Sequence, residues 1–282
     1  MHKNHLPVGV FDSGLGGLTA VRELKRILPN EDILYFGDTA RLPYGTRSPE
    51  IVRKYALDDL NFLLTHSVKA ILIACGTVSS TAINLLKEHS SVPVIGVVEP
   101  ACAKACECSA SGKIAVFATP STVRTGAFNR AIARIRPDAA VLGVGCPMFV
   151  PLVENGYIAR DCAVTRAIAS EYIAKLADFR PDTIILGCTH YPLIADIIAD
   201  CAAEAFGHPV NIVDSGSAAA YALKQYLETH GLAADTDSLG SEHYFVSDEP
   251  YNFADIASRF LGETVNEVTK INIDEYAYSP RS

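Results

Sequence analysis

The sequence predicts an α/β protein built from two similar three-layer lobes with mostly parallel sheets. Apolar, β-branched runs of strand length alternate with helical patterns along the 282 residues, which is typical of parallel α/β sheets. One such run, 71–74, leads into Cys75, and another, 184–187, leads into Cys188. Because this strand and cysteine pattern occurs once in each half, we expect two related lobes with the active site in the cleft between them.

Composition narrows the class of protein. The chain is 49% hydrophobic and 20% charged, as in an ordinary soluble enzyme, and its net charge of −8 argues against non-specific nucleic-acid binding. No apolar run approaches the roughly 18–20 residues that span a bilayer, and the first residues lack a signal-peptide core. We therefore expect a cytoplasmic protein with neither nucleic-acid nor membrane partners. In a reducing compartment its eight cysteines should be free thiols.

The first strand, 8–11, ends in Asp12 and the glycine loop 13–17, and apolar residues at helical spacing follow to Leu28. A glycine-rich turn between a strand and a helix also fits a dinucleotide site. However, Thr19 stands where the G-x-G-x-x-G spacing needs its last glycine, and the carboxylate of Asp12 would repel a phosphate. A carboxylate at this strand end suits an ammonium group or a catalytic thiol better.

The remaining elements alternate in the same way, giving about nine strands. A strand at 33–36 precedes the Pro-Tyr-Gly turn at 43–45, and Ser48-Pro49 starts a long helix. Further strands are predicted at 92–98, 113–118, 140–144, 210–213 and 243–246, and helices at 79–89, 99–111, 161–177, 193–206 and 252–261, with an alanine-rich helix ending near Gly231. The simplest division makes the first lobe discontinuous, 1–97 plus 214–282, with 98–213 as the second lobe.

Each of the two motif cysteines should lie at the carboxyl end of a parallel strand, close to the amino end of a helix. The free N–H groups and the dipole of a helix favour an anionic sulfur there. Two thiols that face one pocket can invert a stereocentre, because one removes a proton from one face and the other returns a proton to the opposite face. This chemistry suits a cysteine whose pKa is lowered by a helix or a cation. His190 could act on Cys188 in this way, and Asp12 on Cys75.

The other cysteines are interpreted as small buried apolar residues; they are Cys102, Cys106, Cys146, Cys162 and Cys201. Zinc binding by Cys102, Cys106 and Cys108 is an alternative interpretation of this segment. Their spacing is not C-x2-C, and no histidine accompanies them. The sequence therefore predicts no metal site.

Five motifs together resemble those of the glutamate racemases, within the aspartate/glutamate racemase family. They are Phe-Asp-Ser-Gly-Leu-Gly-Gly at 11–17, Pro-Tyr-Gly at 43–45, Ala-Cys-Gly-Thr at 74–77, Val-Pro-Leu-Val-Glu at 150–154 and Gly-Cys-Thr-His-Tyr-Pro-Leu at 187–193. The resemblance covers nearly the whole chain in order. It implies cofactor-independent interconversion of L- and D-glutamate, which supplies D-glutamate for peptidoglycan and so for the cell wall and cell shape. It also suggests a homodimer.

By the same resemblance, Cys75 and Cys188 are the two acid/base residues, assisted by Asp12, Glu154 and His190. The implied substrate contacts are Asp12, Ser13, Tyr44, Gly45, Gly76, Thr77, Thr189 and His190, with Thr119 and Thr122 as further candidates for holding a carboxylate. Gly76 departs from the family, which usually has Asn after the first cysteine, so only the backbone can contact the substrate there. No pyridoxal phosphate is implied, since the sequence contains no glycine-rich phosphate cup with an obvious Schiff-base lysine. Backbone N–H groups at the strand-to-helix turns would stabilise the charge that develops on the substrate.

Three other functions stay open at this point. A racemase of aspartate or another small amino acid would share the chemistry and differ in substrate. A non-catalytic protein that binds an acidic ligand between two lobes would leave the paired cysteines unexplained. A thiol-redox or metal protein would contain a disulfide or bound zinc.

Overall fold

Ten strands form two parallel sheets in the computed structural model, which describes residues 3–249, 253–265 and 267–278. The six-stranded sheet has the order β10-β9-β2-β1-β3-β4, with β1 Val8–Asp12, β2 Ile33–Gly37, β3 Ala70–Ile73, β4 Val94–Gly96, β9 Glu242–Val246 and β10 Thr269–Lys270. The four-stranded sheet has the order β6-β5-β7-β8, with β5 Lys113–Ala118, β6 Ala140–Gly145, β7 Thr183–Leu186 and β8 Asn211–Asp214. Every strand pairing is parallel, which confirms the predicted fold class.

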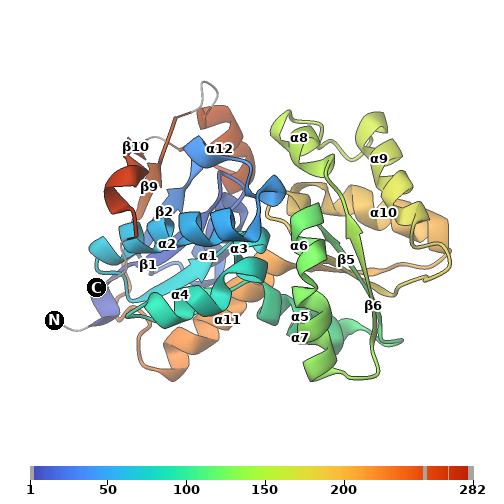
Figure 1. The fold of residues 1–282 in the computed structure, drawn as a ribbon, viewed down its shortest axis with the longest axis horizontal. Coiled ribbons are helices and arrows are strands. Elements are labelled where there is room, and N and C mark those ends of the chain that lie inside the picture. The colour runs from blue at the N-terminus through green and yellow to red at the C-terminus, as the bar shows by residue number, and fades with distance from the viewer. Residues whose placement is uncertain (1–2, 250–252, 266, 279–282) are drawn as a thin grey trace.

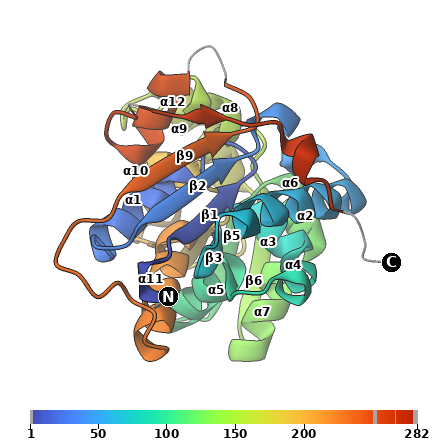
Figure 2. The ribbon, with the colours of Figure 1, turned by 90° about the vertical axis from the view of Figure 1, so that its left-hand side faces the viewer.

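Helices cover both faces of the six-stranded sheet (Figures 1 and 2). One face carries α1 Leu18–Ile27, α11 Ser215–Thr229 and α12 Phe253–Leu261, and the other carries α2 Pro49–Thr65, α3 Gly76–Thr81 and α4 Ile83–His89. Side chains alternate along β1, so Val10 packs toward the α1 face and Phe11 toward the α2 face.

The four-stranded sheet is covered in the same way. On one face lie α5 Val98–Cys108 and α7 Ala127–Ile135, and on the other lie α8 Phe149–Glu154, α9 Ala163–Ala174 and α10 Ala195–Phe206, while α6 Pro120–Thr125 follows β5. The two layered units meet through α11, which packs on both α1 and α5. The carboxyl ends of the central strands β1, β3, β5 and β7 therefore come together at the junction of the two units.

Several predicted elements differ from the observed ones. The predicted helix 79–89 is two helices, because α3 starts at Gly76 and the chain turns at Ala82 before α4. The predicted strand 92–98 is observed as only the three residues of β4. The prediction of about nine strands falls short of the ten in the described residues, because the exposed two-residue β10 carries no apolar pattern. In the predicted final helix 252–261, Asn252 lies outside the described residues.

The helix predicted after Cys188 also begins differently. Residues Tyr191–Ile194 form a 3-10 turn, η4, and α10 starts only at Ala195. The amide of Tyr191 donates to the carbonyl of Cys188, and Pro192 has no amide hydrogen to extend an α-helical ladder. Cys188 is therefore not at the amino end of an α-helix.

Across the described residues, no helix combines the length and the hydropathy required to span a membrane.

Candidate functional site

A cavity of about 540 Å³ lies between the two units, at the carboxyl ends of their central strands. Both Cys75 and Cys188 line it. Its wall contains every predicted site residue except Thr122: Asp12, Ser13, Tyr44, Gly45, Cys75, Gly76, Thr77, Thr119, Glu154, Cys188, Thr189 and His190. The structure therefore brings motifs that lie far apart in the chain together around one cavity.

Cys75 caps the amino end of the short helix α3, as predicted, but its pKa does not behave as predicted. Its thiol donates to Ser13 Oγ over 3.5 Å, and its side chain is buried. Burial and, to a smaller extent, the charge of the nearby Asp12 carboxylate together raise the pKa of Cys75 to about 12. The expectation of a lowered pKa at this cysteine is wrong, because removal from water outweighs the helix terminus and Asp12 supplies a negative charge.

The carboxylate of Asp12 is fixed by the glycine loop. Its Oδ2 accepts from the amides of Gly14 and Gly17, each at 3.1 Å. Its Oδ1 is buried and has no hydrogen-bond partner among the described residues. Burial raises the pKa of Asp12, whereas the charge of His190 lowers it. One carboxylate oxygen is thus left for a donor in the cavity.

The loop glycines serve close packing. A Cβ at Gly17 would lie 2.5 Å from the Asp12 Cβ, and one at Gly16 would lie 2.3 Å from Thr189 Oγ1. Thr19 Oγ1 donates to the carbonyl of Thr189 over 3.1 Å. The loop therefore joins the Asp12 strand to the Cys188 turn, which belongs to the other sheet.

Cys188 lies next to a histidine and carboxylate pair. The Sγ of Cys188 is 3.8 Å from His190 Nδ1, and His190 Nε2 is 2.9 Å from Glu154 Oε1. Burial alone lowers the pKa of His190, but its hydrogen bonds to Cys188 and Glu154 raise that pKa to about 10. His190 is therefore an imidazolium at neutral pH. Its positive charge lies beside the Cys188 sulfur, in place of the predicted helix terminus.

Three threonine hydroxyls meet across the junction. Thr77 Oγ1 lies 3.2 Å from Thr119 Oγ1 and 3.4 Å from Thr122 Oγ1, and the latter two are 3.0 Å apart. Thr77 follows the first cysteine, whereas Thr119 and Thr122 come from the start of α6. Thr122 is buried behind the other two, so it supports the cavity wall without forming part of it.

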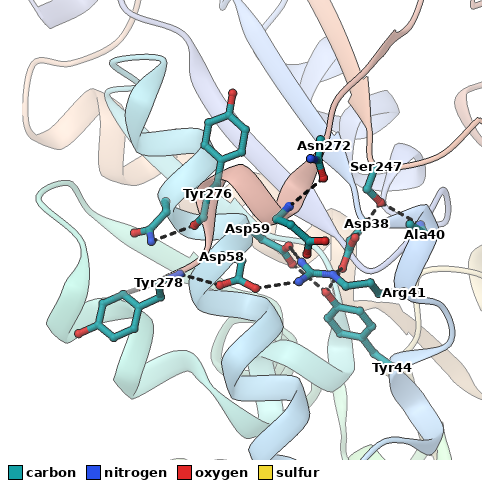
Figure 3. Close-up of polar contacts among 12 residues, drawn as sticks. Asp38, Ala40, Arg41, Tyr44, Asp58, Asp59, Ser247, Asn272, Tyr276 and Tyr278 are labelled. Atoms are coloured by element: carbon teal, nitrogen blue, oxygen red, sulfur yellow. Dashed lines mark hydrogen bonds and ion pairs between the residues drawn. The ribbon is translucent and has the colours of Figure 1, made fainter. Parts of the chain in front are cut away.

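Tyr44 lines the cavity, but its hydroxyl is engaged in a buried charged cluster, which we call the Arg41 cluster (Figure 3). That hydroxyl donates to Asp38 and to Asp59, the latter over 3.1 Å. The Arg41 guanidinium binds Asp38, Asp58 and Asp59 at 2.5, 2.7 and 2.9 Å. The predicted contact between Tyr44 and a ligand can therefore come from its ring or backbone.

Gly76 touches the opposite cysteine turn. A Cβ at this position would lie 2.2 Å from the carbonyl oxygen of Gly187, which is far inside van der Waals contact. The absence of a side chain at 76 thus allows the turns that carry Cys75 and Cys188 to approach each other directly.

Sequence reasoning missed three groups around the site. Arg124, on α6, lines the cavity and is exposed. Arg259 and Phe260, on α12, contact Glu154 and His190 from behind. Arg124 could have been found from its place one helical turn after the Thr119-Pro120 helix start, but no local pattern connects residues 259–260 to the cysteine motifs.

Comparison with known proteins agrees with this geometry. The sequence profile of the Asp/Glu/hydantoin racemases matches residues 15–223. A glutamate racemase of Geobacter metallireducens is 41% identical over 267 residues, which cover 95% of this chain and 97% of that protein. One of Neisseria gonorrhoeae is 39% identical over 268 residues, which cover 95% and 97%.

Solved structures give the same result over the whole fold. Glutamate racemase of Francisella tularensis, in complex with D-glutamate, superposes with a TM-score of 0.89 at 34% identity, covering 97% of this chain and 100% of that chain. The Thermus thermophilus enzyme, in complex with β-chloro-D-alanine, gives 0.84 at 39% identity, covering 96% and 99%. The chain therefore belongs to the Asp/Glu/hydantoin racemase family.

Proposed function

We propose that this protein is a glutamate racemase that interconverts L- and D-glutamate by a two-base mechanism without a cofactor. The observation that carries the proposal is the pair of cysteines, one from each sheet, in the wall of a single cavity. The relatives and the structural neighbours described above are glutamate racemases, and this chain aligns with nearly the whole length of each. This substrate assignment replaces the open alternative of an aspartate racemase.

The charged groups around the cavity differ between its two sides. Cys75 is a thiol, since its pKa is raised to about 12, and it can deliver a proton. On the other side, the Sγ of Cys188 adjoins His190, which can orient that sulfur toward the α-carbon. In one direction, the Cys188 thiolate takes the α-proton as the C–H bond breaks and an S–H bond forms. The Cys75 thiol then gives its proton to the opposite face of the carbanion, and the reverse direction exchanges these roles.

The substrate's charges match the groups around the cavity. The free Oδ1 of Asp12 can accept from the α-ammonium group. The hydroxyls of Thr77, Thr119 and Thr189 can donate to carboxylates, and the exposed cation of Arg124 attracts an acidic ligand to the opening. Ser13, Gly45 and Gly76 offer backbone and hydroxyl contacts in the same wall. An amino acid with two carboxylates therefore fits the donors that are present.

The wider assignments belong to the same proposal. The product D-glutamate would be used for peptidoglycan synthesis in the cytoplasm, and the enzyme would act as a homodimer. The first lobe would comprise 1–97 plus 214–282, and the second lobe would comprise 98–213. The chain would then pass from one lobe to the other at the start of α5 and back again at the end of β8. The sheet membership of the strands supports this division.

Removal of either thiol tests the mechanism. We expect Cys75→Ala and Cys188→Ala each to abolish racemisation, because each leaves one face of the α-carbon without a proton donor or acceptor. Cys108→Ala, at a half-buried position on α5 outside the cavity, is the matched control and should retain activity. Circular dichroism at fixed substrate concentration measures the rate. Racemisation by either active-site variant at the wild-type rate would contradict the proposal.

Solvent deuterium tests the two-base pathway directly. In D₂O, the product enantiomer formed early should carry deuterium at Cα, while the remaining substrate enantiomer should not. Deuterium in the recovered substrate at the same early time would indicate a single base.

Parallel assays with aspartate and glutamate, in both enantiomers, test the substrate assignment.

A further inference from the structure

The helix that carries Glu154 does not by itself fix the Glu154 carboxylate beside His190. Glu154 is the last residue of α8, a helix of six residues, and its side chain is 38% exposed. Its carboxylate reaches His190 through a single 2.9 Å contact. A partly exposed carboxylate at the end of a short helix would ordinarily sample several rotamers. Something else must fix this end of α8.

Arg259 of α12 binds that helix end. Its Nη1 donates to the carbonyl of Glu154 over 2.7 Å and to that of Val153 over 3.3 Å. These are carbonyls at the end of α8, where helical acceptors lack intrahelical partners and a cation is favourable. The turn that follows fits closely around the guanidinium. Gly156 has φ of +81°, and a Cβ there would lie 3.2 Å from Arg259 Nη2.

The next residue of α12 contacts the other member of the pair. The ring of Phe260 is buried and packs edge-on against the imidazole of His190, with centroids 5.0 Å apart and an interplanar angle of 80°. Consecutive residues of one helix therefore contact Glu154 through its backbone and His190 through its ring. Neither residue lines the cavity.

The support crosses from one sheet to the other. α12 connects the parallel strands β9 and β10 of the six-stranded sheet and packs on α1. α8 and the His190 turn belong to the unit built on the four-stranded sheet. α12 and α8 lie side by side at the top of the junction (Figure 1). The orientation of the histidine and carboxylate pair thus depends on an element of the opposite unit.

We propose that Arg259 and Phe260 are positioning residues, which set the Glu154 and His190 pair against Cys188 from across the junction. This inference rests on the proposed racemase function for its kinetic readout, but its structural readout does not. Without Arg259, the end of α8 is released and the Glu154 carboxylate leaves His190. The groups that face His190 are Cys188 from its own turn, Glu154 from α8, Asp12 from β1 and the uncharged Phe260 from α12.

The chain contains a matched control for Arg259. Arg136 Nη1 donates over 2.6 Å to the carbonyl of Ser109, the C-cap residue that follows α5. Gly112, with φ of +71°, lies against its guanidinium, and a Cβ there would be 3.2 Å from Nη2. This is the same arginine and glycine arrangement at a helix end that faces away from the cavity. Arg136→Met should therefore cost stability without changing catalysis.

The experiment compares Arg259→Met, Arg259→Lys, Phe260→Leu and Arg136→Met. We expect Arg259→Met to lower kcat/KM by about tenfold through kcat, with KM changed less than about twofold, because the residue lies outside the cavity wall. Arg259→Lys should recover most of the loss. NMR titration of the His190 ring should show its midpoint about one pH unit lower in Arg259→Met, and also lower in Phe260→Leu, but unchanged in Arg136→Met.

A double-mutant cycle with Glu154→Gln identifies the route. If Arg259 acts through Glu154, Arg259→Met should have little further effect on kcat in the Glu154→Gln background. An unchanged His190 midpoint in Arg259→Met and Phe260→Leu, or fully additive losses with Glu154→Gln, would overturn the inference. The titration needs no turnover, so it stands even if wild-type enzyme fails to racemise glutamate, which would count against the proposed function alone.

Discussion

Folding changes the protonation of His190, whose side chain adjoins Cys188. In the folded protein its pKa is raised to about 10, against about 6.5 in an unfolded chain. Its protonation therefore stabilises the folded state fully below about pH 6.5, and this contribution is lost as the pH rises to about 10. Because one cause of the shift is the hydrogen bond to Glu154, the two residues form a pH-dependent pair.

Glu154→Gln tests this linkage. We expect the variant to be less stable than wild type by about 1 kcal/mol at pH 6, a modest value because solvent screens the partly exposed Glu154. The difference should shrink toward zero as the pH approaches about 10, where the wild-type imidazolium is lost. Urea unfolding of both proteins at several pH values between these limits measures it. A difference that stays constant over this range would contradict the assignment.

At the residue scale, the sequence identified which side chains meet but not how the fold changes their acidity. Cysteine, carboxylate, histidine and threonine residues follow strand ends, and parallel topology alone brings strand ends together. Burial depends on everything packed around a group, so the raised pKa of Cys75 could not be predicted from its position before α3. The roles of Arg259 and Phe260 were missed for a similar reason, since Arg259 contacts Glu154 across 105 positions of sequence and Phe260 contacts His190 across about 70.

At the element scale, the Arg41 cluster secures the turn that carries Tyr44. The guanidinium binds carboxylates from the end of β2 and from α2, and Asp58 also accepts from the amide of Tyr278 near the end of the described chain (Figure 3). Burial, and then the charge of Asp38, raises the pKa of Asp59 well above its usual range. Burial therefore favours the protonated form of Asp59, in which only Asp38 and Asp58 face the guanidinium as carboxylates.

Two substitutions in this cluster should have opposite outcomes. Arg41→Met leaves buried carboxylates without their cation, so we expect a loss of about 3–5 kcal/mol in unfolding free energy. Asp59→Asn mimics the protonated acid that burial favours and should cost less than about 1 kcal/mol at pH 7. Chemical denaturation measures both. Equal losses in the two variants would show that Asp59 is ionised in the folded protein.

The same cluster predicts a pH trend. A raised pKa means that the folded protein holds the proton of Asp59 to a higher pH than the unfolded chain, which releases it near pH 4, so this group destabilises the fold progressively as the pH rises above about 4. Asp59→Asn has no such proton. Its stability relative to wild type should therefore improve with increasing pH, and denaturation at pH 5 and pH 8 checks the direction.

Elements differed in how well the sequence predicted them. The strands that carry the site are continuous buried runs, so β1, β2, β3, β5 and β7 were located to within about a residue or two, as expected for strongly apolar segments. The 3-10 turn after Cys188 and the break between α3 and α4 are local hydrogen-bond choices that hydrophobic periodicity does not encode. The two-residue β10 has no apolar pattern because both its residues are exposed.

At the scale of the whole molecule, the contact between Gly76 and Gly187 fixes how closely the two cysteine turns approach. A Cβ at 76 must move at least about 0.8 Å relative to the Gly187 carbonyl before the contact reaches 3.0 Å. Misplacement of a catalytic group by about 1 Å can cost about a hundredfold in rate. The sequence showed the missing asparagine at this position but not that the opposite backbone lies against it.

Gly76→Ala should accordingly lower kcat/KM by about tenfold to a hundredfold by pushing the two units apart. Gly145→Ala is the control, because a Cβ there meets its nearest neighbour at 3.4 Å, an ordinary contact distance. Kinetics with both enantiomers, together with the unfolding midpoint, separate misplacement from loss of fold. Wild-type kinetics in Gly76→Ala would show that the turns can separate without affecting the cysteines.

The strand order also has a consequence for biosynthesis. The four-stranded sheet uses one uninterrupted stretch of chain, whereas the six-stranded sheet takes β9 and β10 from the far end. On a ribosome, the smaller sheet has all its strands before β9 emerges, but β2 waits with an open edge until β9 arrives to pair with it. α12 emerges after β9, so a nascent chain would contain both cysteines long before Arg259 and Phe260 reach them. The Glu154 and His190 pair would then be held in place only after α12 has emerged.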